Sequence, residues 1–181
     1  MSEWLHTLRE RFTADQPQRL DGYRTFSGFH HITELVTLDS IMCPDLIDEL
    51  NTEDWEHNVH EDFRTELFRD AEYLLARQAL DGSKHQLIAA LECPPTEFAI
   101  PSGFKICGFD IMDSYFGNST LTNCGQIPEA FKPTEVNKFG LIDDRDRAFT
   151  IRDTMRKLQP DDPHLGDCEV WLLARFIPNV G

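Results

Sequence analysis

The chain has 181 residues, of which 40% are apolar and 10% aromatic, enough to build one folded core and too many for a disordered chain. Its 32 acidic residues outnumber its 17 basic residues, which gives a formal net charge of −15. That charge disfavours direct binding to nucleic acid or to an anionic membrane, and it favours a basic protein partner. We expect a single globular domain over residues 1–181.

The first predicted element is a short helix at about residues 3–13. Trp4, Leu5 and Leu8 recur there at helical spacing, and Pro17 is expected to end the segment. Residues 29–38 follow and are rich in aromatic and β-branched side chains, a composition that predicts a strand.

Two helices are predicted next, near residues 44–51 and 52–80. Pro44 suits the first turn of a helix, where its missing N–H is not needed. From Trp55 to Leu75, apolar residues recur at the spacing of an amphipathic helix.

The second half of the chain predicts three strands and one helix. The strands are expected near residues 84–92, 104–112 and 168–177, the helix near 144–158, and a long ordered loop at 114–133. Because the strands do not alternate regularly with helices, the sequence predicts an α+β fold with a mixed or mainly antiparallel sheet.

The stretch CPDLIDELNTEDWEHNVHED, residues 43–62, holds eight carboxylates and no Lys or Arg. Some of these acids are explained by two predicted helix N-termini, where negative charge is stabilising, and others by an ordinary solvated face. The functional alternative is a docking face for a basic partner, with Trp55 either an anchor or a core residue. The predicted partner-binding residues are Asp45, Asp48, Glu49, Glu53, Asp54, Trp55, Glu61, Asp62 and Tyr115.

Two residue sets suggest a rival function, a metal-dependent hydrolase. His57, His60 and Glu61 would share one helix face, although they do not form an H-E-x-x-H motif. A second set could hold Mg²⁺ at a strand end. It comprises Asp110, Asp113, Tyr115 and Asn118, with Asp143 or Asp144.

The five cysteines are odd in number and form no C-x-x-C pair, which predicts reduced thiols and a cytoplasmic protein. Cys124 would need a neighbouring His30, His31 or His164 to act as a nucleophile, and a structural thiol is the simpler interpretation. The sequence contains no glycine-rich nucleotide motif, no segment like a signal peptide and no apolar run of membrane-spanning length.

These observations favour a non-catalytic binding protein that neutralises a basic partner and needs no cofactor. In charge and size the chain is similar to the immunity proteins and antitoxins that bacteria use against toxins. Two alternatives stay open. One is the metal-dependent hydrolase, and the other is an acidic mimic of nucleic acid that inhibits a DNA- or RNA-binding protein.

Overall fold

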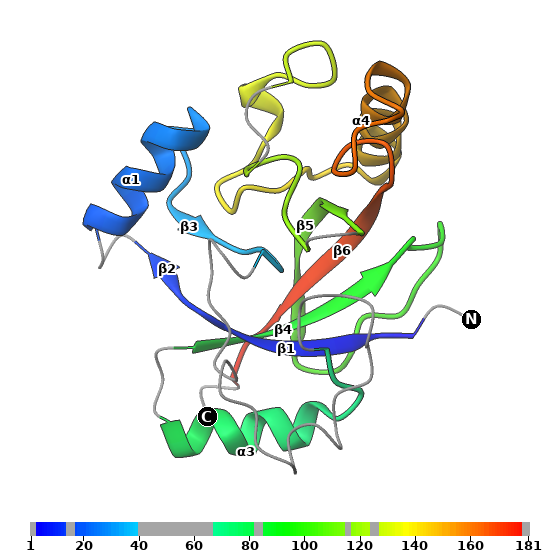
Figure 1. The fold of residues 1–181 in the computed structure, drawn as a ribbon. Coiled ribbons are helices and arrows are strands. Elements are labelled where there is room, and N and C mark those ends of the chain that lie inside the picture. Colours follow the sequence, from blue (N-terminus) through cyan, green and yellow to red (C-terminus); the bar gives the residue numbers. More distant parts are fainter. Residues whose placement is uncertain are drawn as a thin grey trace.

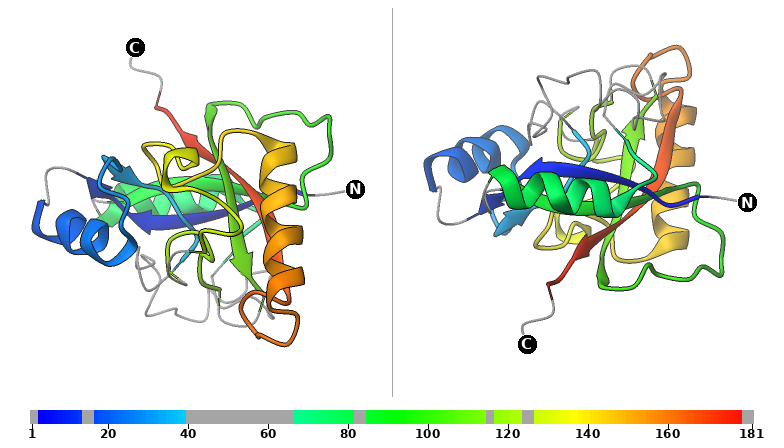
Figure 2. Two further views of the ribbon diagram at one scale, coloured as in Figure 1. Left: turned by 90° about the horizontal axis from the view of Figure 1, so that it is seen from above. Right: turned by 90° about the horizontal axis from the view of Figure 1, so that it is seen from below.

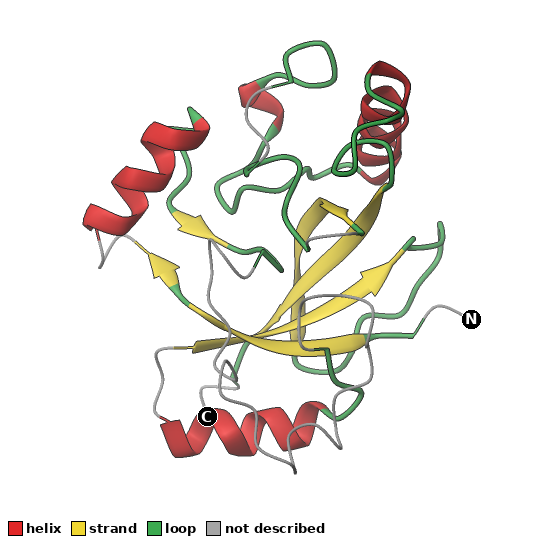
Figure 3. Ribbon diagram, viewed as in Figure 1, coloured by secondary structure: helices red, strands yellow, loops and turns green. Residues whose placement is uncertain are grey.

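A four-stranded antiparallel sheet forms the centre of the molecule (Figure 1, Figure 3). The computed structural model describes residues 3–13, 17–39, 67–81, 85–114, 117–123 and 127–178. The strands, in spatial order, are β1 (Leu5–Glu10), β4 (His85–Glu92), β6 (Cys168–Phe176) and β5 (Phe104–Asp113). A separate two-stranded ribbon pairs β2 (Phe12–Thr13) with β3 (Glu34–Leu35).

Helices cover both faces of the sheet. Helix α3 (Ala71–Asp81) lies below the sheet in Figure 1, whereas α1 (Pro17–Ser27) and α4 (Arg145–Leu158) lie above it. The two views of Figure 2 show α3 and α4 on opposite sides. A 3₁₀ turn, η1 (Pro133–Glu135), precedes α4. The predicted α+β fold is confirmed.

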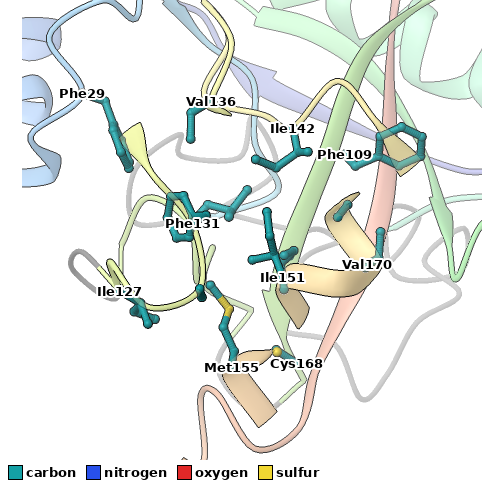
Figure 4. Packing of buried hydrophobic residues seen from close by; sticks show 14 of the residues in the cluster. Phe29, Phe109, Ile127, Phe131, Val136, Ile142, Ile151, Met155, Cys168 and Val170 are labelled. Carbon is teal, nitrogen blue, oxygen red and sulfur yellow. The ribbon is translucent and has the colours of Figure 1, made fainter. Parts of the chain in front are cut away.

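The largest part of the core lies between α4 and the sheet (Figure 4). Ile151 and Met155 of α4 pack with Phe109 of β5, Val170 of β6 and Phe131 of the preceding loop. Asp144 begins the helix, because its side chain accepts a hydrogen bond of 2.7 Å from the Arg147 amide. The predicted strands near 84–92, 104–112 and 168–177 and the helix near 144–158 are all confirmed, to within about two residues.

The predicted N-terminal helix is wrong, because these residues form β1 and β2. Strand β1 pairs antiparallel with β4, from Leu5 opposite Ala90 to Glu10 opposite His85. Both faces of β1 are covered, so four consecutive residues are buried, including Thr7 and Arg9. A strand that is covered on both faces does not alternate between apolar and polar residues. The leucines of β1 also recur at a spacing that is typical of a helix, which explains the wrong prediction.

The next segment also differs from its prediction. Pro17 does not end a helix but begins α1, a position that its fixed φ angle suits. The strand predicted for residues 29–38 is reduced to β3, since the chain first makes a turn in which the Ile32 amide donates to Phe29 O over 3.2 Å. Arg24 Nε donates to Ile32 O over 2.7 Å and holds this turn against α1.

The predicted helix 44–51, and residues 52–66 of the predicted helix 52–80, lie outside the described residues. A continuous helix through residues 67–70 is wrong. The Phe68 amide and carbonyl both bond to His6 of β1, over 2.8 and 2.7 Å, and α3 begins only at Ala71. Asp70 Oδ1 accepts from the Tyr73 amide over 3.0 Å and so caps the start of α3.

A β-bulge in β5 brings the 137–142 loop close to the sheet. The register with β6 shifts between Ile106 and Gly108, and Gly108 has a φ of 143°. A Cβ atom at Gly108 would lie 2.7 Å from Leu141 Cβ and 2.9 Å from Ile142 O. Only glycine therefore permits this approach.

In the part of the chain that the structure describes, no helix is both long and apolar enough to cross a bilayer.

Candidate functional site

All of the predicted partner-binding residues lie outside the described residues. They are Asp45, Asp48, Glu49, Glu53, Asp54, Trp55, Glu61, Asp62 and Tyr115. The same is true of His57, His60 and Glu61, the first predicted metal-ligand set, and of Cys124. The described structure instead shows what holds the two ends of this part of the chain.

Both ends of the acidic segment, which we define as residues 40–66, are anchored in one part of the core. Leu38 before the segment and Leu67 after it are each 0% exposed and belong to the cluster around Trp171. Phe68 is also fully buried and is bonded to β1. The residues that flank the segment are therefore buried in one part of the core.

Asp39, the last described residue before the acidic segment, is bonded to the loop that runs along β5. Its Oδ2 atom accepts from the Ser119 amide over 3.0 Å and from Asn123 Nδ2 over 2.8 Å. The loop itself is tied to β5, because the Thr120 amide donates to Ile111 O over 2.7 Å. Asp39 is thus held beside β5, the edge strand of the sheet.

A second buried carboxylate, Asp110 of β5, joins the same network. Its two oxygens accept from Ser119 Oγ over 2.6 Å and from Thr37 Oγ1 over 2.8 Å. The Ile111 amide donates a third bond over 2.8 Å. Ser119 bonds to both carboxylates, to Asp39 through its amide and to Asp110 through its hydroxyl. We name this group, consisting of Thr37, Asp39, Asp110, Ser119 and Asn123, the carboxylate network.

Burial raises the pKa of Asp110 to about 7, and the nearby charge of Asp39 adds to the rise against the opposing hydrogen bonds. A carboxyl group with such a pKa exchanges a proton near neutral pH. Asp110 is 1% exposed and Asp39 is 0% exposed, so neither presents an open surface to a substrate. The two carboxylates therefore have a structural role, and Asp110 is the group of the network whose pKa lies near neutral pH.

Asp113 makes a different contact, with His164. His164 Nδ1 lies 2.7 Å from Asp113 Oδ2, and the imidazole is about one-third exposed while the carboxylate is buried. The loop is shaped by Asp162, whose Oδ1 accepts from the His164 amide over 2.8 Å. A carboxylate that orients a partly exposed imidazole is found in general-base sites and equally in structural pairs.

Among the described residues of the predicted Mg²⁺ set, Asp110 and Asp113 do not come together, because their side chains serve separate networks, and Tyr115 lies outside the described residues. Asp144 caps α4, and Asp143 Oδ1 accepts from Asn137 Nδ2 over 2.7 Å. Asn118 lies in the loop beside β5, where its carbonyl accepts from the Asp113 amide over 2.9 Å. The described residues contain no group of three His, Cys, Asp or Glu side chains that could hold a metal ion.

The described cysteines and histidines do not form a nucleophile with its base. Cys107 and Cys168 are buried and Cys93 is exposed, and all three are free thiols. Burial raises the pKa of Cys168 to about 11, which keeps this thiol protonated at neutral pH. His31 Nε2 lies 2.6 Å from Val136 O. A pairing of His30, His31 or His164 with Cys124 lies outside the described residues.

Many of the basic side chains form ion pairs with acidic side chains of the same chain. Arg147 forms a bond of 2.6 Å to Glu135, and Arg152 and Arg156 both contact Glu169. Within the described residues, ion pairs with Asp or Glu are made by Arg11, Arg24, Arg69, Arg145, Arg147, Arg152, Arg156 and Arg175.

Sequence reasoning missed the carboxylate network. The sequence predicts a strand that ends at Leu38, next to Asp39, and places Ser119 and Asn123 in the ordered loop at 114–133, without linking the two regions. The one available signal was the density of Ser, Thr and Asn in residues 117–123, which is typical of side chains that bond to backbone and to carboxylates. No model of a known protein family, no curated protein and no solved structure matches this chain.

Proposed function

We propose that the protein is a non-catalytic binding protein that captures and neutralises a basic protein through its acidic segment. One observation carries this proposal. Residues 40–66 contain nine acidic residues and a single arginine, Arg64, so the segment holds −8 of the chain's net charge of −15. A local excess of charge steers an oppositely charged partner and raises the rate of encounter.

The anchoring of the segment supports a docking role. Leu38 and Leu67 are fully buried at its two ends, and Asp39 is held by Ser119 and Asn123. Fixed ends reduce the conformational entropy that a segment loses when it binds. The framework of the sheet would therefore present the carboxylates at low entropic cost.

The internal use of arginine supports the same role. The described arginines are paired mostly within the fold, as Arg147 is with Glu135 and Arg24 with Asp21. Exposed acids such as Glu72, Glu97 and Glu129 add to the negative field. Much of the described arginine charge is thus balanced within the fold, and the exposed carboxylates remain for a partner.

The mechanism we propose is occlusion. Carboxylates of the acidic segment would pair with Arg and Lys around the partner's active site and block the entry of its substrate. This is the action of an immunity protein or antitoxin against a toxin such as a nuclease. Within the described part of the chain, Cys93, Cys107 and Cys168 are free thiols, which supports a location in a reducing cytoplasm.

Charge reversal tests the proposal. We expect the variant Asp48→Lys, Glu49→Lys, Glu61→Lys, Asp62→Lys to lose a partner that the wild-type protein captures from its host's lysate. Eight units of charge change within one short segment, so the loss should be at least about a hundredfold in affinity. The measurement is capture of the tagged protein at low salt and at about 0.5 M salt, followed by titration calorimetry with the purified partner.

The matched control reverses four exposed acids elsewhere: Glu72→Lys, Glu97→Lys, Glu129→Lys and Asp161→Lys. This variant has the same net charge as the first and should retain most of the affinity. Circular dichroism must show that both variants fold. Equal binding by the two variants, or capture of a partner that salt does not weaken, would refute the assignment to the acidic segment.

A further inference from the structure

A basic cavity lies at the end of β6, although the chain as a whole is strongly acidic. It has a volume of about 280 Å³ and is lined by Lys105, Ile106, Cys107, Lys138, Phe139, Arg175 and Ile177. Three of these seven side chains are cationic, and the described residues place no carboxylate on its wall. The cavity is formed by β5, by the 137–142 loop and by the end of β6.

Two of the cations lie opposite each other on neighbouring strands. Lys105 of β5 is the direct register partner of Arg175 of β6. Like charges in directly opposed positions of an antiparallel pair destabilise the sheet. Glu34 compensates this repulsion only in part, because its carboxylate is shared between two arginines. Glu34 Oε1 lies 2.5 Å from Arg175 Nη1 and 2.9 Å from Arg11 Nη2.

The third cation is held beside the same aromatic ring as Arg175. Lys138 Nζ lies 4.8 Å from the centroid of the Phe139 ring, and Arg175 Cζ lies 5.4 Å from it. These are distances of cation–π contacts. The Phe139 ring thus contacts two cations, although their like charges repel each other.

The loop that carries Lys138 and Phe139 is rigid. Asn137 Oδ1 accepts from the Phe139 amide over 2.8 Å, and its Nδ2 donates to Cys107 O over 2.8 Å. Lys138 O accepts from the Thr33 amide over 3.0 Å. The loop backbone is therefore held in place beside the cavity, which lowers the entropic cost of placing Lys138 there when an anion binds.

We propose that this basic cavity binds a small phosphate monoester. The phosphate would lie between Lys105, Lys138 and Arg175 and relieve their mutual repulsion, since guanidinium and ammonium groups both bind phosphate strongly. Ile106, Phe139 and Ile177 would contact the body of the ester. A volume of about 280 Å³ suits one phosphate with a small attached group. The proposal rests on described residues alone and does not depend on the protein partner.

Calorimetric titration at low ionic strength tests the site. The probes are AMP and glucose 6-phosphate, with inorganic phosphate and the uncharged compounds adenosine and glucose for comparison. We expect at least one of the two esters to bind more tightly than inorganic phosphate, with a dissociation constant below about 1 mM. The uncharged compounds should not bind, and added salt should weaken the ester.

The test variant is Lys105→Gln with Lys138→Gln, and its control is Lys132→Gln with Lys157→Gln, which removes two other exposed lysines. The test variant should bind the ester at least about tenfold more weakly, and the control should match the wild type. Because repulsion with Arg175 is removed, the urea midpoint of the test variant should not fall. The proposal is overturned if neither ester binds, if neither binds more tightly than inorganic phosphate, or if both variants lose affinity equally.

Discussion

A Gly108→Ala variant is expected to be destabilised by about 2–5 kcal/mol, as measured by urea denaturation. The φ of 143° at Gly108 is one that L-residues rarely adopt. The added methyl group would also lie 2.7 Å from Leu141 Cβ and 2.9 Å from the backbone oxygen of Ile142. These atoms belong to the loop paired with β5, so they cannot move without breaking the Phe109 and Ile142 hydrogen bonds of 2.8 and 2.9 Å.

Gly22→Ala is the matched control for this substitution. Gly22 lies inside α1, and a Cβ atom there would meet no atom within 4 Å. Alanine in a helix interior loses less conformational entropy than glycine, so this variant should gain about 0.5–1 kcal/mol. Similar urea midpoints for Gly108→Ala and the wild type would show that the loop yields freely, and would contradict the rigid support inferred for Lys138 and Phe139.

An Asp110→Asn variant is expected to change how stability depends on pH. The pKa of Asp110 is about 7 in the folded protein, whereas 3.8 is its ordinary value. Between these values the folded state binds one proton more than the unfolded state, so the carboxyl group makes the protein less stable as pH rises from about 4 to 7. The slope for one group is at most about 1.4 kcal/mol per pH unit.

Asparagine does not titrate, so this contribution should disappear in Asp110→Asn. The difference in unfolding free energy between variant and wild type should shift in favour of the variant as the pH rises from about 5 to 8. Asp161→Asn, a change at an exposed position, is the control for loss of one carboxylate and should retain the contribution of Asp110. Parallel profiles for Asp110→Asn and the wild type, measured by urea denaturation at each pH, would refute a raised pKa at Asp110.

The pH dependence bears on the proposed function. Deprotonation of Asp110 places a second negative charge beside Asp39, which holds the start of the acidic segment through Ser119 and Asn123. A rise in pH through about 7 should therefore weaken this anchor. Titration of the captured partner with Asp110→Asn at several pH values would show whether binding follows the same change.

The sequence by itself determined the elements whose pattern is local. Strands β4, β5 and β6 are long apolar runs bounded by turn residues, and α4 has helical periodicity, an acidic first turn and a basic last turn. These features act between near neighbours in the chain. The net charge and the acidic segment could also be identified from the sequence, because they depend only on the identity of the residues.

The tertiary structure alone decided the conformation of the N-terminal region, the carboxylate network and the basic cavity. Leu5–Glu10 form a strand because they pair with β4, about 80 residues later, and this pairing overrides local helical spacing. Asp39 and Asp110 share Ser119, and Lys105 faces Arg175, only because sheet register and a β-bulge bring distant residues together. Local patterns carry no information about such register, so these sites could be found only in the folded molecule.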